Sequence, residues 1–146
     1  MPSVRGCNLP DDLLYDVDNH IWFSEVGDGT VKIGMTTVAT AMAGRLVAFT
    51  PKRVGRSVRA GKSCGTLESG KWVGPAKSAA GGEVVAVNDA MVNEPSIAND
   101  DPYEAGWLLI LKPEDWDAVK ATLVVGTDVA ASYEAKMDSE GFGGCE

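Results

Sequence analysis

A short repeat constrains the fold of this chain more than any other feature of its sequence. The run from Gly44 to Phe49 (GRLVAF) returns 38 residues later as Gly82 to Val87 (GEVVAV). A small residue precedes each copy and a polar turn follows it. β-Branched and apolar residues in such a pattern favour strands, so the repeat predicts two similar β units. Two such units favour a duplicated sandwich or a flattened barrel.

The rest of the chain is rich in turn-forming residues, with 17 glycines and seven prolines among 146 residues. This composition predicts one domain of short strands. Residues 20–34 hold two β-rich runs around a Gly-Asp-Gly turn and predict a hairpin, and the apolar run 106–112 predicts a central strand. Helices are expected at residues 36–43, just after Pro113, and at residues 127–137.

The stretch from Leu67 to Pro75 (LESGKWVGP) places one lysine, Lys71, among turn-forming residues. Gly70 can adopt the positive φ that tight hairpin turns require, and Gly74 with Pro75 disfavours an ordinary central strand after the turn. Such a hairpin would hold the Lys71 amine out at its tip. This lysine is either a solvated charge or the attachment site of a covalently bound cofactor.

Basic residues gather around Lys71 in the sequence, although the chain carries a net charge of −8. Residues 45–77 hold eight basic side chains and one acidic side chain, Glu68. The block is either a solvated pair of basic strands or a docking face for acidic partners, which complementary charge would attract. Nucleic acid is not an expected partner, because the pI is about 4.6 and Phe49 is the one aromatic residue within residues 45–71.

The chain contains three cysteines and one histidine, His20, and it lacks a C-x-x-C pair, so no metal site is expected. No run of 18 apolar residues occurs, and the first residues lack the apolar core of a signal peptide. We therefore expect a cytoplasmic protein without a membrane partner, whose cysteines are thiols at rest. Cys64 is expected in the core. Cys7 and Cys145 are either unrelated terminal thiols or a pair that the fold brings together.

Several longer segments resemble the H protein of the glycine cleavage system, a lipoyl-carrying relative of the biotinyl and lipoyl domains. Residues 20–22 (HIW) resemble the family's H-E-W, and residues 68–71 (ESGK) resemble its lipoylation site, E-S-V-K. Residues 29–36 (GTVKIGMT) and 82–88 (GEVVAVN) continue the match. Residues 99–107 (NDDPYEAGW) are close to the family's N-E-D-P-Y-G-E-G-W and are the strongest part of the resemblance.

This resemblance implies a mainly β fold of the lipoyl/biotinyl type: a flattened β-barrel, or two-sheet sandwich with a quasi-twofold repeat, plus short helices and a C-terminal helix. It implies a single lipoyl-carrier domain over residues 1–146, with a core at about 15–125 and a helical tail at about 126–146. Lipoic acid would be joined to Lys71 as an amide by a lipoate ligase or a lipoyl synthase-type attaching enzyme. The protein would then be a carrier rather than an enzyme, and we expect it to be a monomer.

The residues around Lys71 also depart from the family pattern. Glu68 and Ser69 would help the attaching enzyme recognise the hairpin, or would satisfy N–H groups of the turn. Gly70 and Trp72 replace the valine and alanine that usually flank the lysine. The indole of Trp72 is expected either to fold back on its own hairpin or to meet the lipoyl arm or a partner.

These departures, together with the tail from Gly141 to Glu146 (GFGGCE), resemble one branch of lipoate-binding proteins. Members of that branch accompany heterodisulfide-reductase-like complexes in sulfur-oxidising prokaryotes, which implies an arm that carries sulfur in the cytoplasm. Cys7 and Cys145 would then exchange with lipoamide or with the sulfur cargo. The alternative is a glycine cleavage H protein, which carries the aminomethyl group from glycine decarboxylase. A third alternative is an unmodified interaction module that binds acidic proteins.

Overall fold

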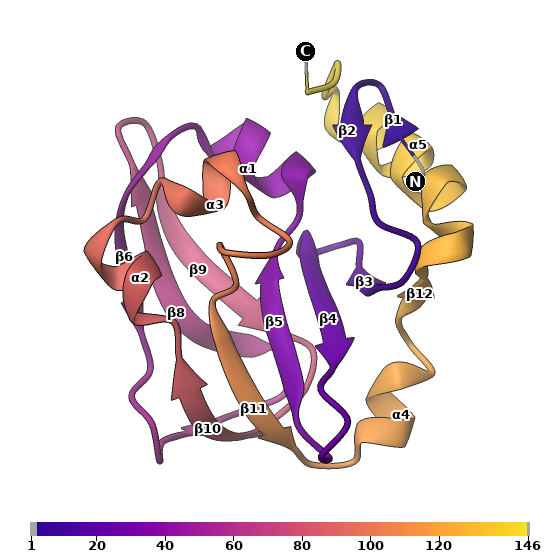
Figure 1. Ribbon diagram of the computed structural model, residues 1–146. Helices are drawn as coiled ribbons and strands as arrows, with labels where there is room; N and C mark the ends of the chain where they lie inside the picture. The colour runs from indigo at the N-terminus through magenta and orange to yellow at the C-terminus, as the bar shows by residue number, and fades with distance from the viewer. Residues whose placement is uncertain (1–2, 146) are drawn as a thin grey trace.

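The computed structural model describes residues 3–145 as a mainly β fold with short helices (Figure 1). Residues 1, 2 and 146, which belong to the ends of the predicted domain and tail, lie outside the described residues. The strands are β1 (Ser3–Val4), β2 (Cys7–Asn8), β3 (Leu14–Asp16), β4 (Ile21–Glu25), β5 (Val31–Met35), β6 (Leu46–Pro51), β7 (Ser57–Val58), β8 (Lys62–Ser69), β9 (Val73–Ser78), β10 (Gly82–Val87), β11 (Leu109–Pro113) and β12 (Val124–Val125). The helices are α1 (Thr37–Ala43), α2 (Asp89–Asn93), α3 (Ile97–Asp100), α4 (Trp116–Lys120), the 3-10 helix η1 (Gly126–Asp128) and α5 (Val129–Glu140).

Two antiparallel sheets form the body of the fold. The larger sheet has the strand order β12-β3-β4-β5-β11-β10-β7, and the smaller one has the order β6-β8-β9. The first copy of the sequence repeat enters β6 in the smaller sheet, and the second copy is β10 in the larger sheet. The predicted two-sheet fold with short helices and a C-terminal helix is therefore confirmed.

Most predicted elements are present with shifted ends. The hairpin predicted at residues 20–34 is β4 with β5, and the predicted central strand is β11, which lies between β5 and β10. The helix expected just after Pro113 begins three residues later, because Pro113 is the last residue of β11 and pairs with Gly82. The C-terminal helix, α5, buries its stripe of Val129, Tyr133 and Met137.

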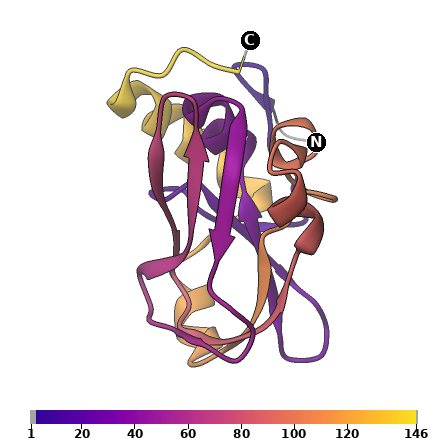
Figure 2. The same ribbon diagram turned by 90° about the vertical axis from the view of Figure 1, so that its left-hand side faces the viewer.

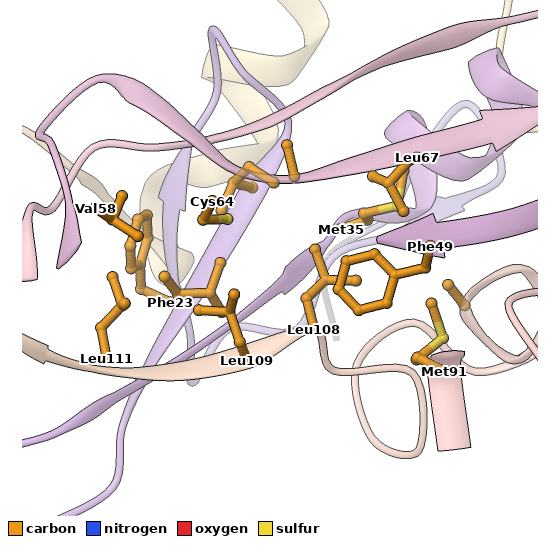
Figure 3. Close-up of a cluster of buried hydrophobic side chains, with 14 of the residues drawn as sticks. Phe23, Met35, Phe49, Val58, Cys64, Leu67, Met91, Leu108, Leu109 and Leu111 are labelled. Atoms are coloured by element: carbon orange, nitrogen blue, oxygen red, sulfur yellow. The ribbon is translucent and has the colours of Figure 1, made fainter. Parts of the chain in front are cut away.

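Two clusters of buried side chains make up the core. The larger cluster lies between the sheets and includes Phe23, Phe49 and Leu109, together with the predicted core residue Cys64 (Figure 3). The smaller one packs α5 against the N-terminal segment and includes Cys7. Since the first cluster holds more of the buried apolar side chains than the second, the sandwich is the main source of hydrophobic stabilisation. None of the helices formed by residues 3–145 is both long and apolar enough to cross a membrane.

The segment after α5 runs beside the turn between β1 and β2 (Figures 1 and 2), where the N–H of Cys145 donates to the Arg5 carbonyl (3.0 Å). Cys7 and Cys145 form a disulfide across a sequence separation of 138 residues. Arg5 adds a second contact, because its guanidinium donates to the Phe142 carbonyl (3.0 Å) and pairs with Glu134 (3.0 Å). The expectation that all three cysteines are thiols is therefore wrong for this pair, because the fold brings the two terminal segments together.

Candidate functional site

Lys71 lies in the turn between β8 and β9, at the upper left of Figure 1. The N–H of Ser69 donates to the carbonyl of Trp72 (2.7 Å) and closes a turn around Gly70 and Lys71. The φ of Gly70 is not positive, and a Cβ added there would meet no atom within 4 Å. The expectation that this turn uses the conformational freedom of glycine is therefore wrong. The side chain of Lys71 itself is exposed.

The tip of this hairpin rests on the C-terminal end of α1. The Ser69 hydroxyl donates to the carbonyl of Ala43 (2.6 Å), and the N–H of Lys71 donates to the same hydroxyl oxygen (3.3 Å). The stem of Lys71 runs over Gly44, where an added Cβ would lie 3.1 Å from the Lys71 Cε. Gly44 also has a φ of 84°, so glycine both ends α1 and leaves room for the lysine.

Ser69 and Glu68 thus differ in their structural roles. Ser69 is only 5 % exposed and satisfies a turn N–H, which was one of the two roles expected for it. Glu68 is exposed on β8 opposite Val73. Because a partner enzyme can reach Glu68, its side chain is available for recognition.

The segment 99–107 holds the chain beneath the tip. Asn99 donates from its amide to the Gly44 carbonyl (2.9 Å) and accepts from the N–H of Leu46 (2.9 Å). Arg45, between those two residues, pairs with Asp100 (3.2 Å). The sequence marks this segment as a family motif but does not reveal its structural role. That role is to fix the link between α1 and β6 beneath Lys71.

An apolar pocket of about 270 Å³ opens beside the hairpin tip. Met35, Met42 and Trp72 line it together with His20. The Trp72 ring is 37 % exposed and packs on its own strand, because a Cβ at Gly74 would lie 2.4 Å from the ring. The indole therefore folds back on the hairpin and forms one wall of the pocket. The individual apolar residues gave no sign of this pocket in the sequence.

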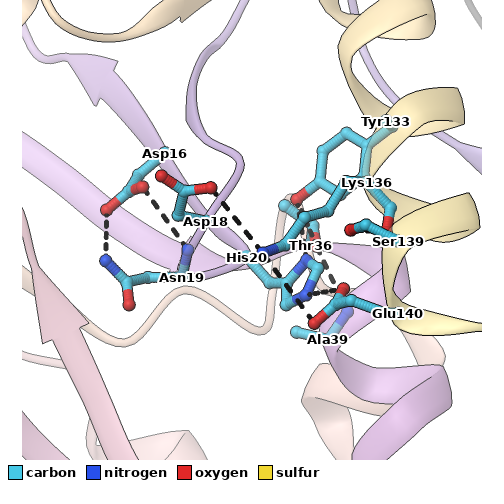
Figure 4. Close-up of polar contacts among 10 residues, drawn as sticks. All are labelled: Asp16, Asp18, Asn19, His20, Thr36, Ala39, Tyr133, Lys136, Ser139 and Glu140. Atoms are coloured by element: carbon cyan, nitrogen blue, oxygen red, sulfur yellow. Dashed lines mark hydrogen bonds and ion pairs between the residues drawn. The ribbon is translucent and has the colours of Figure 1, made fainter.

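His20 lines the pocket with a polar ring, and Figure 4 shows its polar contacts. Its Nε2 lies 3.0 Å from a carboxylate oxygen of Glu140, and its Nδ1 lies 3.2 Å from the Tyr133 hydroxyl. Burial lowers the pKa of His20 below its ordinary value and outweighs Glu140, which favours the charged ring. The neutral ring keeps its contact with Glu140 by donating from Nε2, and its Nδ1 then faces the Tyr133 hydroxyl, which also bonds the Thr36 hydroxyl (3.3 Å).

The prediction that the basic block surrounds Lys71 is wrong. In the register of the hairpin, Lys62 pairs with Ser78 and Lys77 pairs with Ser63, at the far end of β8 from the tip. The eight residues of β8 separate the two ends by roughly 25 Å. Near the tip, Arg45 is already paired with Asp100. Proximity in the sequence misled here because a hairpin places its tip and its base at opposite ends.

The Cys7–Cys145 disulfide lies at the other end of α1 from the lysine. The Cys145 Sγ is 3.7 Å from the carbonyl of Thr37, the first residue of α1, whereas Lys71 packs on Gly44, just after its last residue. The structure therefore places the lysine and the cysteines against opposite ends of one short helix. Cys64 is buried, and burial raises the pKa of its thiol to about 12, so it is unreactive at neutral pH.

Comparisons with known proteins match most of the chain. The family model described as glycine cleavage H-protein matches residues 13–136. The chain is 46 % identical to glycine cleavage system H protein 5 of Aquifex aeolicus over 97 % of both chains, and 38 % identical to H protein 2 of the same organism over 94 % of this chain and 86 % of the relative. The crystal structure of a glycine cleavage system H protein from Mycobacterium marinum superposes with a TM-score of 0.75 at 34 % identity, covering 89 % of this chain and 99 % of that one.

Proposed function

Because the chain belongs to the glycine cleavage H-protein family, we propose that Lys71 is the lysine that carries its lipoyl group. Proteins of this family hold lipoic acid covalently on a lysine and are carriers rather than enzymes. One observation carries the proposal: Lys71 is exposed at a hairpin tip, next to an apolar pocket. We further propose that residues 1–146 act as one lipoyl-carrier domain.

The residues around Lys71 fit a lipoyl group. The hydrocarbon chain of a lipoyl group could pack in the apolar pocket that Met35, Met42 and Trp72 line. Ser69 fixes the base of the arm by its bond to the Ala43 carbonyl. The lysine and lipoyl chains together would reach roughly 12–15 Å from the backbone. When bound, the group supplies a dithiol and disulfide pair that exchanges with thiols.

We propose sulfur as the cargo of this arm, in cytoplasmic sulfur oxidation with a heterodisulfide-reductase-like complex. The departures at Gly70 and Trp72 support this proposal, because they change the surface that partner enzymes meet at the tip. Cys7 and Cys145 are proposed as residues that exchange with sulfur compounds.

The alternative cargo is the aminomethyl group from glycine decarboxylase, and the words "glycine cleavage system" in the names of the relatives favour it. In either case the partners would be the enzyme that attaches lipoate and the enzymes that load and unload the arm. We expect the carrier to meet each of them as a monomer.

Two assays on the lipoylated protein distinguish the cargoes. The first measures glycine decarboxylation and exchange with a glycine decarboxylase, and the second measures sulfur transfer from a persulfide donor to the reduced protein by intact mass. We expect peptide mapping to place the accepted sulfur on the arm at Lys71, and we expect glycine exchange to be absent. Lys71→Arg, the matched control, should lose the sulfur at position 71, so that any sulfur it still accepts lies on Cys7 or Cys145. Glycine exchange without sulfur transfer would replace the sulfur proposal with the alternative.

A further inference from the structure

We propose that the end of the sandwich remote from Lys71 is a docking surface for an acidic segment of a partner protein. We call this surface the basic end, and it consists of Lys52, Arg53, Arg56, Arg59, Lys62 and Lys77. These residues lie at the base of the β8–β9 hairpin and on the two loops that flank β7. A partner held there would leave the tip with Lys71 free to reach another enzyme.

The basic end contains two turns of the same type, at residues 53–56 and 59–62. The N–H of Arg56 donates to the carbonyl of Arg53 (3.0 Å), and the N–H of Lys62 donates to the carbonyl of Arg59 (3.0 Å). Each turn has glycine as its third residue, Gly55 with a φ of 91° and the corresponding glycine, Gly61, with a φ of 77°. That conformation is typical of a type II turn. Both turns therefore present a basic residue at their first and last positions.

The backbone of both turns is fixed to neighbouring strands. The N–H of Gly55 donates to the Val84 carbonyl (2.8 Å), and the N–H of Val84 donates to the Arg56 carbonyl (2.9 Å). The N–H of Gly61 donates to the Ser78 carbonyl (2.7 Å). A fixed backbone holds the charges in place before a partner arrives, which reduces the entropy lost on binding.

The charges of the basic end have no acidic partner in the part of the chain that the structure describes. The ion pairs of residues 3–145 use Arg5, His20, Arg45, Lys120 and Lys136. The chain has 21 acidic residues for 13 basic ones, so carboxylates are plentiful elsewhere. A group of exposed like charges destabilises the folded state by mutual repulsion, and an acidic partner would relieve that repulsion.

The shape of the basic end favours a short acidic peptide segment over a long polyanion. Lys52, Arg53 and Arg56 surround a hollow of about 300 Å³ with Pro51. Guanidinium groups bind carboxylates through two parallel hydrogen bonds, which a Glu or Asp side chain in this hollow can accept. A nucleic acid would extend past the basic end onto the rest of the surface. The acidic residues there, which give the whole chain its net charge of −8, would repel it.

Titration of the labelled full chain with an octaglutamate peptide, followed by amide NMR shifts, tests this proposal. We expect shift changes confined to residues 52–62 and around Lys77, with affinity falling about tenfold as the salt concentration rises from about 0.02 to 0.2 M. The variant R53A/R56A should bind at least about fivefold more weakly. The matched control K32A/K112A removes the same charge from the larger sheet and should bind like the unchanged protein.

Equal loss of binding in both variants, or shifts spread over the hairpin tip, would overturn the proposal. Tighter binding of an oligothymidine of equal charge would overturn it in favour of a nucleic-acid surface. Attachment of lipoate to Lys71, measured by mass in the same variants, is expected to be unchanged. The docking surface and the carrier function can therefore fail separately.

Discussion

The hydroxyl of Ser69 donates a 2.6 Å hydrogen bond to the backbone carbonyl of Ala43, at the last residue of α1. The same oxygen accepts from the N–H of Lys71. One buried side chain thus joins the hairpin tip to the helix that it rests on. Its neighbour Glu68 is exposed, so Ser69 stabilises the tip and Glu68 is open to a partner.

We expect Ser69→Ala to lower the free energy of unfolding by about 1–3 kcal/mol, because the Ala43 carbonyl loses its buried donor. Glu68→Ala, one residue away but exposed, should change it by less than about 0.5 kcal/mol. Urea unfolding of both variants measures the difference. Equal costs would show that the Ser69 bond does not stabilise the tip.

Gly74 and Gly70, two glycines of the hairpin, should respond differently to the same substitution. A Cβ at Gly74 would overlap the Trp72 ring at 2.4 Å, whereas a Cβ at Gly70 meets nothing within 4 Å. We expect Gly74→Ala to push the indole out of the pocket wall and shift its fluorescence to longer wavelength. Gly70→Ala should leave the spectrum unchanged, and Trp72→Phe identifies the contribution of Trp72.

Stability should depend on pH through His20, the one histidine of the chain. Burial lowers the pKa of His20 in the fold, so near its ordinary pKa the unfolded chain binds a proton that the folded chain does not. The contribution of neutral His20 to the free energy of unfolding is therefore complete above about pH 7. It decreases as the pH falls towards about 5.5, by at most about 1.4 kcal/mol per pH unit.

Replacement of His20 by glutamine should flatten this dependence, which thermal unfolding between about pH 5.5 and 7 measures. Gln keeps a donor for Glu140 and removes the titrating ring. A slope that survives in the variant would assign the pH dependence to groups other than His20.

Reduction of the Cys7–Cys145 disulfide should lower the melting temperature. A link that closes nearly the whole chain is expected to contribute about 2–5 kcal/mol, which corresponds to roughly 5–15 °C for a domain of this size. The variant Cys7→Ser should melt at the reduced temperature with or without reductant. An unchanged melting temperature on reduction would mean that Arg5 and the packing of α5 hold the ends by themselves.

Strand content, the hairpin that holds Lys71 and the C-terminal helix could be predicted because local patterns encode them. The repeat of apolar residues marks β6 and β10, and the spacing of Val129, Tyr133 and Met137 marks the buried face of α5. These features depend on residues that are close in the sequence, where period and turn chemistry are informative.

The pocket and the distance of the basic end from Lys71 could not be predicted, because tertiary packing decides both. Met42 and Trp72 are 30 residues apart and meet only after α1 folds beneath the hairpin. The basic residues are near Lys71 in sequence, yet the direction of β8 carries them to the opposite end of the sheet. Register and topology, which no short pattern encodes, decide both outcomes.

Intact mass after incubation with a lipoate ligase and lipoate tests the central claim most directly. We expect the mass to rise by one lipoyl group, peptide mapping to place it on Lys71, and Lys71→Arg to stay folded and unmodified. No adduct, or an adduct on Lys77 at the other end of the hairpin, would contradict the assignment of Lys71 as the lipoyl anchor.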